Sequence, residues 1–182
     1  MYSEQEIIDG CKKEKPSFQE ALYKLYAGRM MAICKRYAKT DFEAEDVFHD
    51  AFVKVYKHIN TFEGGSFEGW MKRIFVRTAI NNFHKNKAHY QNIEWGDYPE
   101  EGAVQPDAVN HLSAQDLMKI INKLPEGYRL VFNLHAVEGY SHPEIAEMLN
   151  ITEGTSRSQL FKAKAMLKQM LAKLSITSYA NG

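Results

Sequence analysis

Apolar residues recur along most of the chain at intervals of three and four positions, and no alternating pattern extends over a useful length. Such intervals are typical of amphipathic α-helices, so the pattern predicts helices and no sheet. Capping residues, glycines and prolines indicate where these helices begin and end. The predicted helices cover residues 4–13, 18–38, 41–58, 67–87, 114–123, 126–137, 142–149 and 153–174.

Short polar motifs mark several helix starts, because a serine followed three residues later by an acidic residue suits a capping box. This spacing occurs at Ser3 with Glu6, Ser17 with Glu20, Ser113 with Asp116, and Ser141 with Glu144. The helix over 41–58 is expected to take Asp41 as its cap. The apolar stripes predict buried residues Leu22, Leu25, Tyr26, Met30, Ile33 and Tyr37 on the second helix, and Trp70, Ile74 and Phe83 on the fourth.

The net charge of zero conceals an acidic block between two mildly basic ones. Residues 1–87 carry 15 basic and 12 acidic side chains, residues 88–116 carry no basic and 6 acidic ones, and residues 117–182 carry 8 and 5. The acidic block is also rich in Gly, Pro and Asn, which is typical of a linker between domains. We therefore predict an all-α protein with two small helical domains, 1–87 and 113–182, joined by an acidic linker over 88–112.

Several classes of protein do not fit this composition. No run approaches the ~20 apolar residues of a membrane-spanning helix, and the polar, acidic N-terminus is unlike a signal peptide. Cys11 and Cys34 are too few for a disulfide framework, which fits a reducing cytoplasm. We find no paired acid/base carboxylates in an apolar setting, no nucleophile elbow and no phosphate-binding glycine loop. We therefore expect a cytoplasmic protein without membrane insertion that is not an enzyme.

Residues 141–170 predict a helix-turn-helix, whose second helix enters the major groove of DNA. Asn150 tolerates the left-handed conformation that ends a helix, and Thr152 suits the cap of the next one. The apolar seam is expected from Ile145, Leu149, Ile151, Leu160 and Leu167. The outward face is expected to carry Arg157, Ser158, Phe161, Lys162 and Lys164. The simpler interpretation is a helical hairpin with a solvated basic face, and Ser156 stands where many such motifs have a branched apolar residue.

The fourth predicted helix combines cations with amides on one side. Its polar residues at three- and four-residue steps are Arg73, Arg77, Asn81, His84 and Lys85. This pattern suits contacts to phosphates and base edges. Just before it, Phe62 and Phe67 bracket the pair Gly64-Gly65; aromatic rings stack on unpaired bases, and glycines let backbone approach a ligand closely. For this loop we favour the simpler interpretation, in which both phenylalanines belong to the core.

The first turns of the third predicted helix are acidic. They carry Glu43, Glu45, Asp46, His49 and Asp50. Glu45 and His49 have a spacing that suits a metal ion, but no further ligand stands at a fitting distance. Carboxylates here are also favoured by the helix dipole. We therefore expect a structural or partner-binding acidic face, with no metal and no cofactor.

Five segments together resemble those of the extracytoplasmic-function sigma factors of bacterial RNA polymerase. They are AEDVFHDAFVKVY (44–56), GSFEGWMKRI (65–74), LPEGYR (124–129), GYSHPEIAEML (139–149) and EGT (153–155), and they span nearly the whole chain. The resemblance implies a subunit that binds core RNA polymerase and directs it to promoter DNA. It implies that the first domain melts the minus-10 element, that the second reads the minus-35 element, and that the linker threads a nucleic-acid channel. It also implies an anti-sigma factor as a partner.

The resemblance assigns residues to three surfaces. For docking on core polymerase it implies Asp46, His49, Asp50 and Lys54. For the minus-10 element it implies Asn60, Phe62, Ser66, Phe67, Arg73, Arg77 and Asn81. For the minus-35 element it implies Arg157, Ser158, Phe161 and Lys162.

Two other functions are open from the sequence. A sigma-like mimic that only sequesters an anti-sigma factor would not need its DNA-facing cations, yet Arg73, Arg77, Lys85, Arg157 and Lys162 are all present. A helix-turn-helix repressor with a ligand-binding N-terminal domain leaves the motifs of residues 44–56 and 60–66 unexplained. Because the net charge is zero, we expect the chain alone to bind duplex DNA weakly and in a salt-sensitive way.

Overall fold

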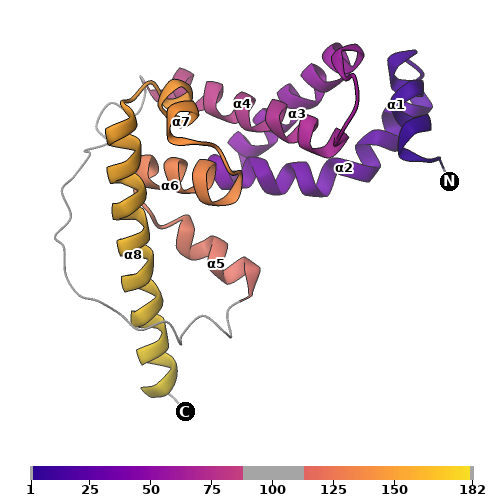
Figure 1. Ribbon diagram of the computed structural model, residues 1–182. Coiled ribbons are helices and arrows are strands. Elements are labelled where there is room, and N and C mark those ends of the chain that lie inside the picture. Colours follow the sequence, from indigo (N-terminus) through magenta and orange to yellow (C-terminus); the bar gives the residue numbers. More distant parts are fainter. Residues whose placement is uncertain (1, 88–112, 181–182) are drawn as a thin grey trace. The chain divides into compact units, whose positions relative to one another are not determined.

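The computed structural model describes residues 2–87 and 113–180, which belong to two helical units (Figure 1). The N-terminal unit contains α1 (Glu4–Lys12), α2 (Pro16–Tyr37), α3 (Asp41–His58), the 3-10 turn η1 (Ile59–Thr61) and α4 (Phe67–Lys87). The C-terminal unit contains α5 (Ala114–Ile121), α6 (Glu126–Phe132), the π-helical turn η4 (Asn133–Val137), α7 (His142–Leu149) and α8 (Glu153–Ala180). The described residues include no strand, which confirms the all-α prediction. The predicted acidic linker, 88–112, lies outside them.

Local capping explains where the helices of the N-terminal unit begin. Ser3 and Glu6 form the predicted capping box of α1. The cap of α3 is Thr40 and not Asp41, because the backbone is extended at Thr40 and its hydroxyl accepts a hydrogen bond from the Glu43 N–H at 3.1 Å. Ser17 is not a cap either, since α2 already begins at Pro16, whose fixed φ suits the first helical position.

The core of the N-terminal unit forms where α4 packs against α2 and α3. Phe75 is fully buried, and its ring centroid lies 5.2 Å from that of Phe52. Trp70, Ile74 and Phe83, which form the predicted stripe, are only half-buried, and the Trp70 ring packs on Phe67. The helix contacts two neighbours, so its buried side is broader and is centred on Phe67, Met71, Phe75, Val76, Ala79 and Ile80. Leu25 of α2, also predicted to be buried, is 45% exposed.

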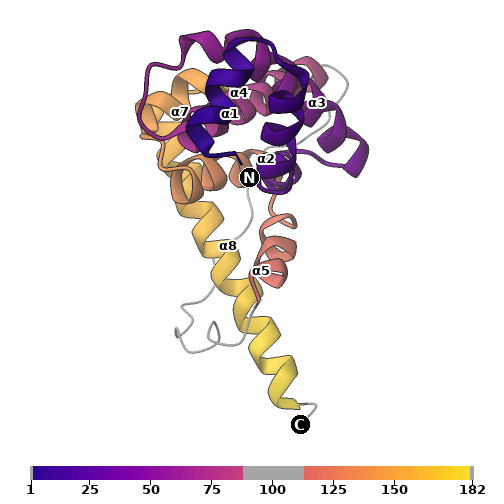
Figure 2. The same cartoon turned by 90° about the vertical axis from the view of Figure 1, so that its right-hand side faces the viewer.

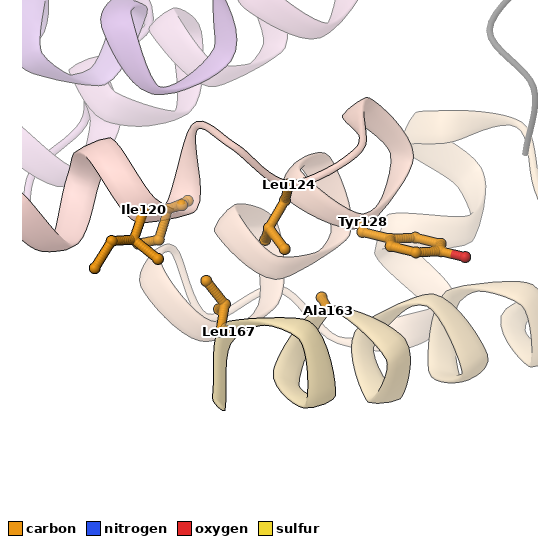
Figure 3. Packing of buried hydrophobic residues seen from close by; sticks show 6 residues of the cluster. Ile120, Leu124, Tyr128, Ala163 and Leu167 are labelled. Atoms are coloured by element: carbon orange, nitrogen blue, oxygen red, sulfur yellow. The ribbon is translucent and has the colours of Figure 1, made fainter. Parts of the chain in front are cut away.

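The C-terminal unit is organised around α8, which packs against α5, α6 and α7. Figure 2 shows α5 alongside α8. Figure 3 shows part of the buried cluster that joins them, with Ile120 and Leu124 near Ala163 and Leu167 of α8. The predicted seam is confirmed: Ile151 is half-buried, and the buried members are Ile145, Leu149, Leu160 and Leu167. In the described part of the chain no helix has the length and apolar character needed to cross a membrane.

Candidate nucleic-acid and partner interfaces

The turn between α7 and α8 is held by short-range hydrogen bonds. Ser141 and Glu144 form the predicted capping box, in which the Ser141 N–H donates to Glu144 Oε2 at 2.8 Å. Asn150 ends α7 in the left-handed conformation, with φ of 54°. Thr152 Oγ1 accepts from the Thr155 N–H at 3.0 Å and caps the start of α8. These contacts confirm the predicted helix-turn-helix.

The first turns of α8 present a surface that we name the α8 reading face, formed by Arg157, Ser158, Phe161 and Lys162. Arg157 and Ser158 are exposed, Phe161 is 66% exposed, and Lys162 is half-buried. Arg157 Nη2 lies 2.9 Å from Glu153 Oε2, and both side chains are exposed. A solvent-exposed pair of this kind stabilises by only about 0–1 kcal/mol, so it does not keep the guanidinium from a stronger partner. An exposed phenylalanine here suits contact with a thymine methyl group.

Ser156 lies beside this face but is fully buried. Its hydroxyl is satisfied, because His142 Nδ1 and Ser156 Oγ share a hydrogen bond of 2.9 Å. The His142 ring stacks on His135 with ring centroids 4.6 Å apart, and His135 Nδ1 donates to the Tyr140 carbonyl at 2.9 Å. These contacts tie η4 and α7 to the start of α8. This role of His142 was not predicted from the sequence, although Ser156 at a usually apolar position was the signal that a buried partner exists.

Acidification is expected to weaken the C-terminal unit through His142. Its pKa is lowered from the ordinary value of 6.5, first by burial and then by the neighbouring His135 and Arg157. The unfolded chain therefore binds the proton more readily, so this stability is full above pH 6.5 and is lost as the pH falls through the lowered pKa. In urea unfolding between about pH 7.5 and 5.5, the wild type should lose more stability than His142→Gln. An identical pH dependence of the two proteins would contradict this role.

The exposed side of α4 carries a line of side chains at four-residue steps, which we name the α4 cationic row: Arg73, Arg77, Asn81 and Lys85. Successive members are about 6 Å apart along the helix axis. Within residues 2–87 and 113–180, Arg73 and Arg77 form no ion pair, so no carboxylate there neutralises them. By contrast, Arg29 and Lys72 both pair with Glu68, at 2.7 and 3.1 Å. Among the described residues, no acidic group therefore competes with an anionic ligand for Arg73 and Arg77.

The connection between α3 and α4 buries its two aromatic residues and exposes the segment between them. Phe62 is 8% and Phe67 1% exposed, and their ring centroids lie 5.1 Å apart. Both rings also contact Trp70. The simpler interpretation of this loop, with both phenylalanines in the core, is confirmed. Stacking of either ring on a base would require it to leave the core.

Other residues assigned to this loop are exposed. Asn60 lies in η1, and Gly64 and Gly65 have positive φ angles of 136° and 83°. The Ser66 hydroxyl accepts from the Gly69 N–H at 3.0 Å and so caps the start of α4. The exposed backbone from residue 63 to residue 66 is therefore the part of the loop that a ligand reaches first.

The outward side of α3 carries the predicted acidic face. Asp46, His49 and Asp50 are all exposed. Two apolar side chains share this side of the helix, Phe42 at 71% and Val53 at 65% exposure. Neither exposure was predicted from the sequence, although apolar residues among polar ones on an outward stripe were a detectable signal. Exposed apolar side chains grouped with charges are typical of a protein-docking surface, and we name these five residues the α3 docking face.

Lys54 differs from the other residues assigned to docking. Its side chain is half-buried, and its Nζ donates to Thr78 Oγ1 of α4 at 3.2 Å. Thr78 is itself buried and donates to the Ile74 carbonyl at 2.8 Å. Lys54 thus links α3 to α4, and its role in docking stays a prediction. No cluster of three or more His, Cys, Asp or Glu side chains suited to a metal ion occurs among the described residues.

Comparison with known families gives two matches that fall on the two units. A model described as Sigma-70 region 2 matches residues 22–89, and one described as Sigma-70, region 4 matches residues 114–167. The ECF RNA polymerase sigma factor SigW of Bacillus subtilis is 28% identical over 178 residues, covering 90% of this chain and 95% of the relative. The ECF RNA polymerase sigma factor SigE of Mycolicibacterium smegmatis is 28% identical over 168 residues, and the match covers 90% of this chain but 65% of that relative.

Two solved structures share the fold. The sigma factor RpoE of Bartonella quintana, in complex with the anti-sigma factor NepR, gives a TM-score of 0.51 at 24% identity, covering 85% of this chain and 96% of that one. CnrH, in complex with the cytosolic domain of CnrY, gives a TM-score of 0.50 at 18% identity, covering 91% and 94%. The succession of helices along the chain is therefore one found in solved structures.

Proposed function

The chain belongs to the extracytoplasmic-function sigma factors, and we propose that it binds core RNA polymerase and directs it to promoters by reading two DNA elements. In this proposal the N-terminal unit engages the minus-10 element and the C-terminal unit the minus-35 element. The chain acts as an initiation factor in the cytoplasm and catalyses no reaction itself. Its partners are core polymerase, promoter DNA and an anti-sigma factor.

The observation that carries the proposal is a separate exposed cationic surface in each matched region. Arg73 and Arg77 of the α4 cationic row fall in the region 2 match, and Arg157 of the α8 reading face falls in the region 4 match. Cations beside exposed amide, hydroxyl and aromatic groups suit DNA, because phosphate contacts position a protein and base contacts give specificity. A mimic that only captures an anti-sigma factor has no use for both surfaces.

The α3 docking face supports the polymerase part of the proposal. It offers the exposed carboxylates of Asp46 and Asp50 beside Phe42 and Val53, a combination that suits a cationic and partly apolar protein surface. An anti-sigma partner is supported by the fold shared with RpoE, whose solved structure contains the anti-sigma factor NepR. Capture by such a partner would regulate the chain by keeping it from the polymerase.

The test is a titration of the fluorescently labelled full chain with core polymerase, with and without duplex DNA. The proposal predicts saturable binding to core and weak, salt-sensitive binding to DNA when core is absent. A mimic would bind neither core nor DNA, and a repressor would bind DNA tightly without core. Either of those results would contradict the proposal.

A further inference from the structure

Lys12, at the end of α1, contacts the connection between α3 and α4. Its half-buried side chain donates a hydrogen bond from Nζ to the Phe62 carbonyl at 2.9 Å, across 50 positions of sequence. Figure 1 shows this connection beside α1, and α1 also packs against η1. Phe62 directly follows η1 and directly precedes the exposed segment 63–66. The charged donor therefore holds the backbone at one end of that segment.

The position of α1 is itself closely defined, so Lys12 is held in place. Gly10 lies against Phe18 of α2, where a Cβ atom would be 2.1 Å from Phe18 Cγ. The Tyr26 hydroxyl of α2 donates to Glu4 Oε2 at the other end of α1. These contacts fix α1 on α2 at both ends, and through Lys12 the same helix fixes the loop.

The opposite end of the exposed segment is also fixed. Ser66 caps α4 through the Gly69 N–H, and the Trp70 N–H donates to the Ser66 carbonyl at 3.0 Å. Between the two fixed ends lie Gly64 and Gly65, where an added Cβ would meet no atom within 4 Å. Their surroundings therefore do not brace this short stretch, and its conformation depends on its two ends.

We infer that Lys12 is a positioning residue that holds segment 63–66 in the arrangement that engages the single-stranded minus-10 element. The inference rests on the proposed function, because it assigns the loop of that same site a preformed geometry. A loop that is already ordered loses less conformational entropy when it binds than a mobile one. Without the Lys12 hydrogen bond, the loop becomes ordered only when DNA binds. The entropy lost in that step makes the binding free energy less favourable.

The test compares two variants of Lys12. Lys12→Met has a side chain of similar length without the hydrogen-bond donor, and Lys12→Arg keeps a cationic donor. Lys13→Met is the matched control, because Lys13 is the exposed neighbour and the same charge is removed. Each full-length variant is assembled with core polymerase. The probe is the forked DNA that wild-type holoenzyme selects from a pool with a randomised single-stranded minus-10 segment.

We expect Lys12→Met holoenzyme to bind this probe about fivefold more weakly, with Lys12→Arg partly restoring affinity and Lys13→Met close to wild type. Affinity for core should be unchanged in all variants. Hydrogen exchange of the amides in segment 61–66 should be faster in free Lys12→Met than in free Lys13→Met. This second measurement needs no DNA, and it separates loop positioning from a general loss of charge.

Three results would overturn the inference and leave the proposed function standing. The first two are equal probe binding by Lys12→Met and wild type, and an equal loss of binding in Lys13→Met. The third is unchanged hydrogen exchange in the loop. If wild-type holoenzyme selects no sequence from the pool, the proposed function fails and the inference falls with it.

Discussion

Replacing Asp50 with arginine is expected to lower the affinity of the chain for core polymerase roughly tenfold or more. Asp50 is exposed on the α3 docking face, close in sequence to Val53, which is 65% exposed. The substitution changes the local charge by two and places a cation where the proposal expects a cationic partner. Like charges at an interface oppose binding more strongly than the loss of a single contact. The measurement is a fluorescence titration of labelled chain with core polymerase.

A matched control separates docking from a general effect of charge. Glu20 is an exposed carboxylate on α2 that pairs with Lys24, also exposed. Glu20→Arg reverses the same charge, and loss of this exposed pair costs little. It should leave core affinity close to wild type, while both variants keep the helical content of the wild type. If Asp50→Arg binds core polymerase as tightly as wild type, the assignment of α3 to the polymerase interface is contradicted.

Removing the side chain of Arg157 is expected to relax sequence preference at one or two positions of the minus-35 element. Arg157 is exposed one turn into α8, where a side chain reaches the base edges when the helix enters the groove. A good arginine–base pair discriminates by about 1–3 kcal/mol, which corresponds to roughly 5-fold to 150-fold. The Glu153 ion pair is exposed, so giving it up costs little. Competition between the cognate sequence and single-base variants measures the effect.

Lys164 provides the comparison for Arg157. It is also exposed on α8 but lies two turns further along, where contact with phosphate is expected. Lys164→Ala should weaken binding to all sequences by a similar factor and flatten the salt dependence. The competition is therefore run at two salt concentrations for both variants. If Arg157→Ala also weakens all sequences equally, Arg157 holds phosphate and α8 does not read bases at that position.

The helix-turn-helix could be predicted closely because its determinants are local. The Ser141–Glu144 box and the Asn150 and Thr152 positions each act within a few residues. Asp41, however, was wrongly predicted as the N-cap of α3. The N-cap is the neighbouring Thr40, because its backbone is extended and its hydroxyl accepts from the Glu43 N–H. Spacing within one helix therefore predicts the existence of a helix better than its first residue.

Contacts between distant segments could not be predicted. The hydrogen bond from Lys12 to Phe62 and the pairing of His142 with Ser156 join residues 50 and 14 positions apart. Lys54 shows the same limit, because nothing in the sequence indicates that its ammonium group donates to Thr78 of α4. Periodicity identifies the side of a helix, but the neighbouring helices determine which polar side chains on that side remain free.

Transcription in vitro tests the central claim most directly, since that claim is that this chain gives core polymerase promoter specificity. Core polymerase is incubated with a library of linear templates, with and without the full chain, and the start sites of the transcripts are sequenced. The account predicts that the chain adds discrete start sites, each preceded by a common two-part DNA element. In the Arg157→Ala variant, the sequence preference should be relaxed only in the upstream part of that element. Start sites that are the same with and without the chain would contradict it.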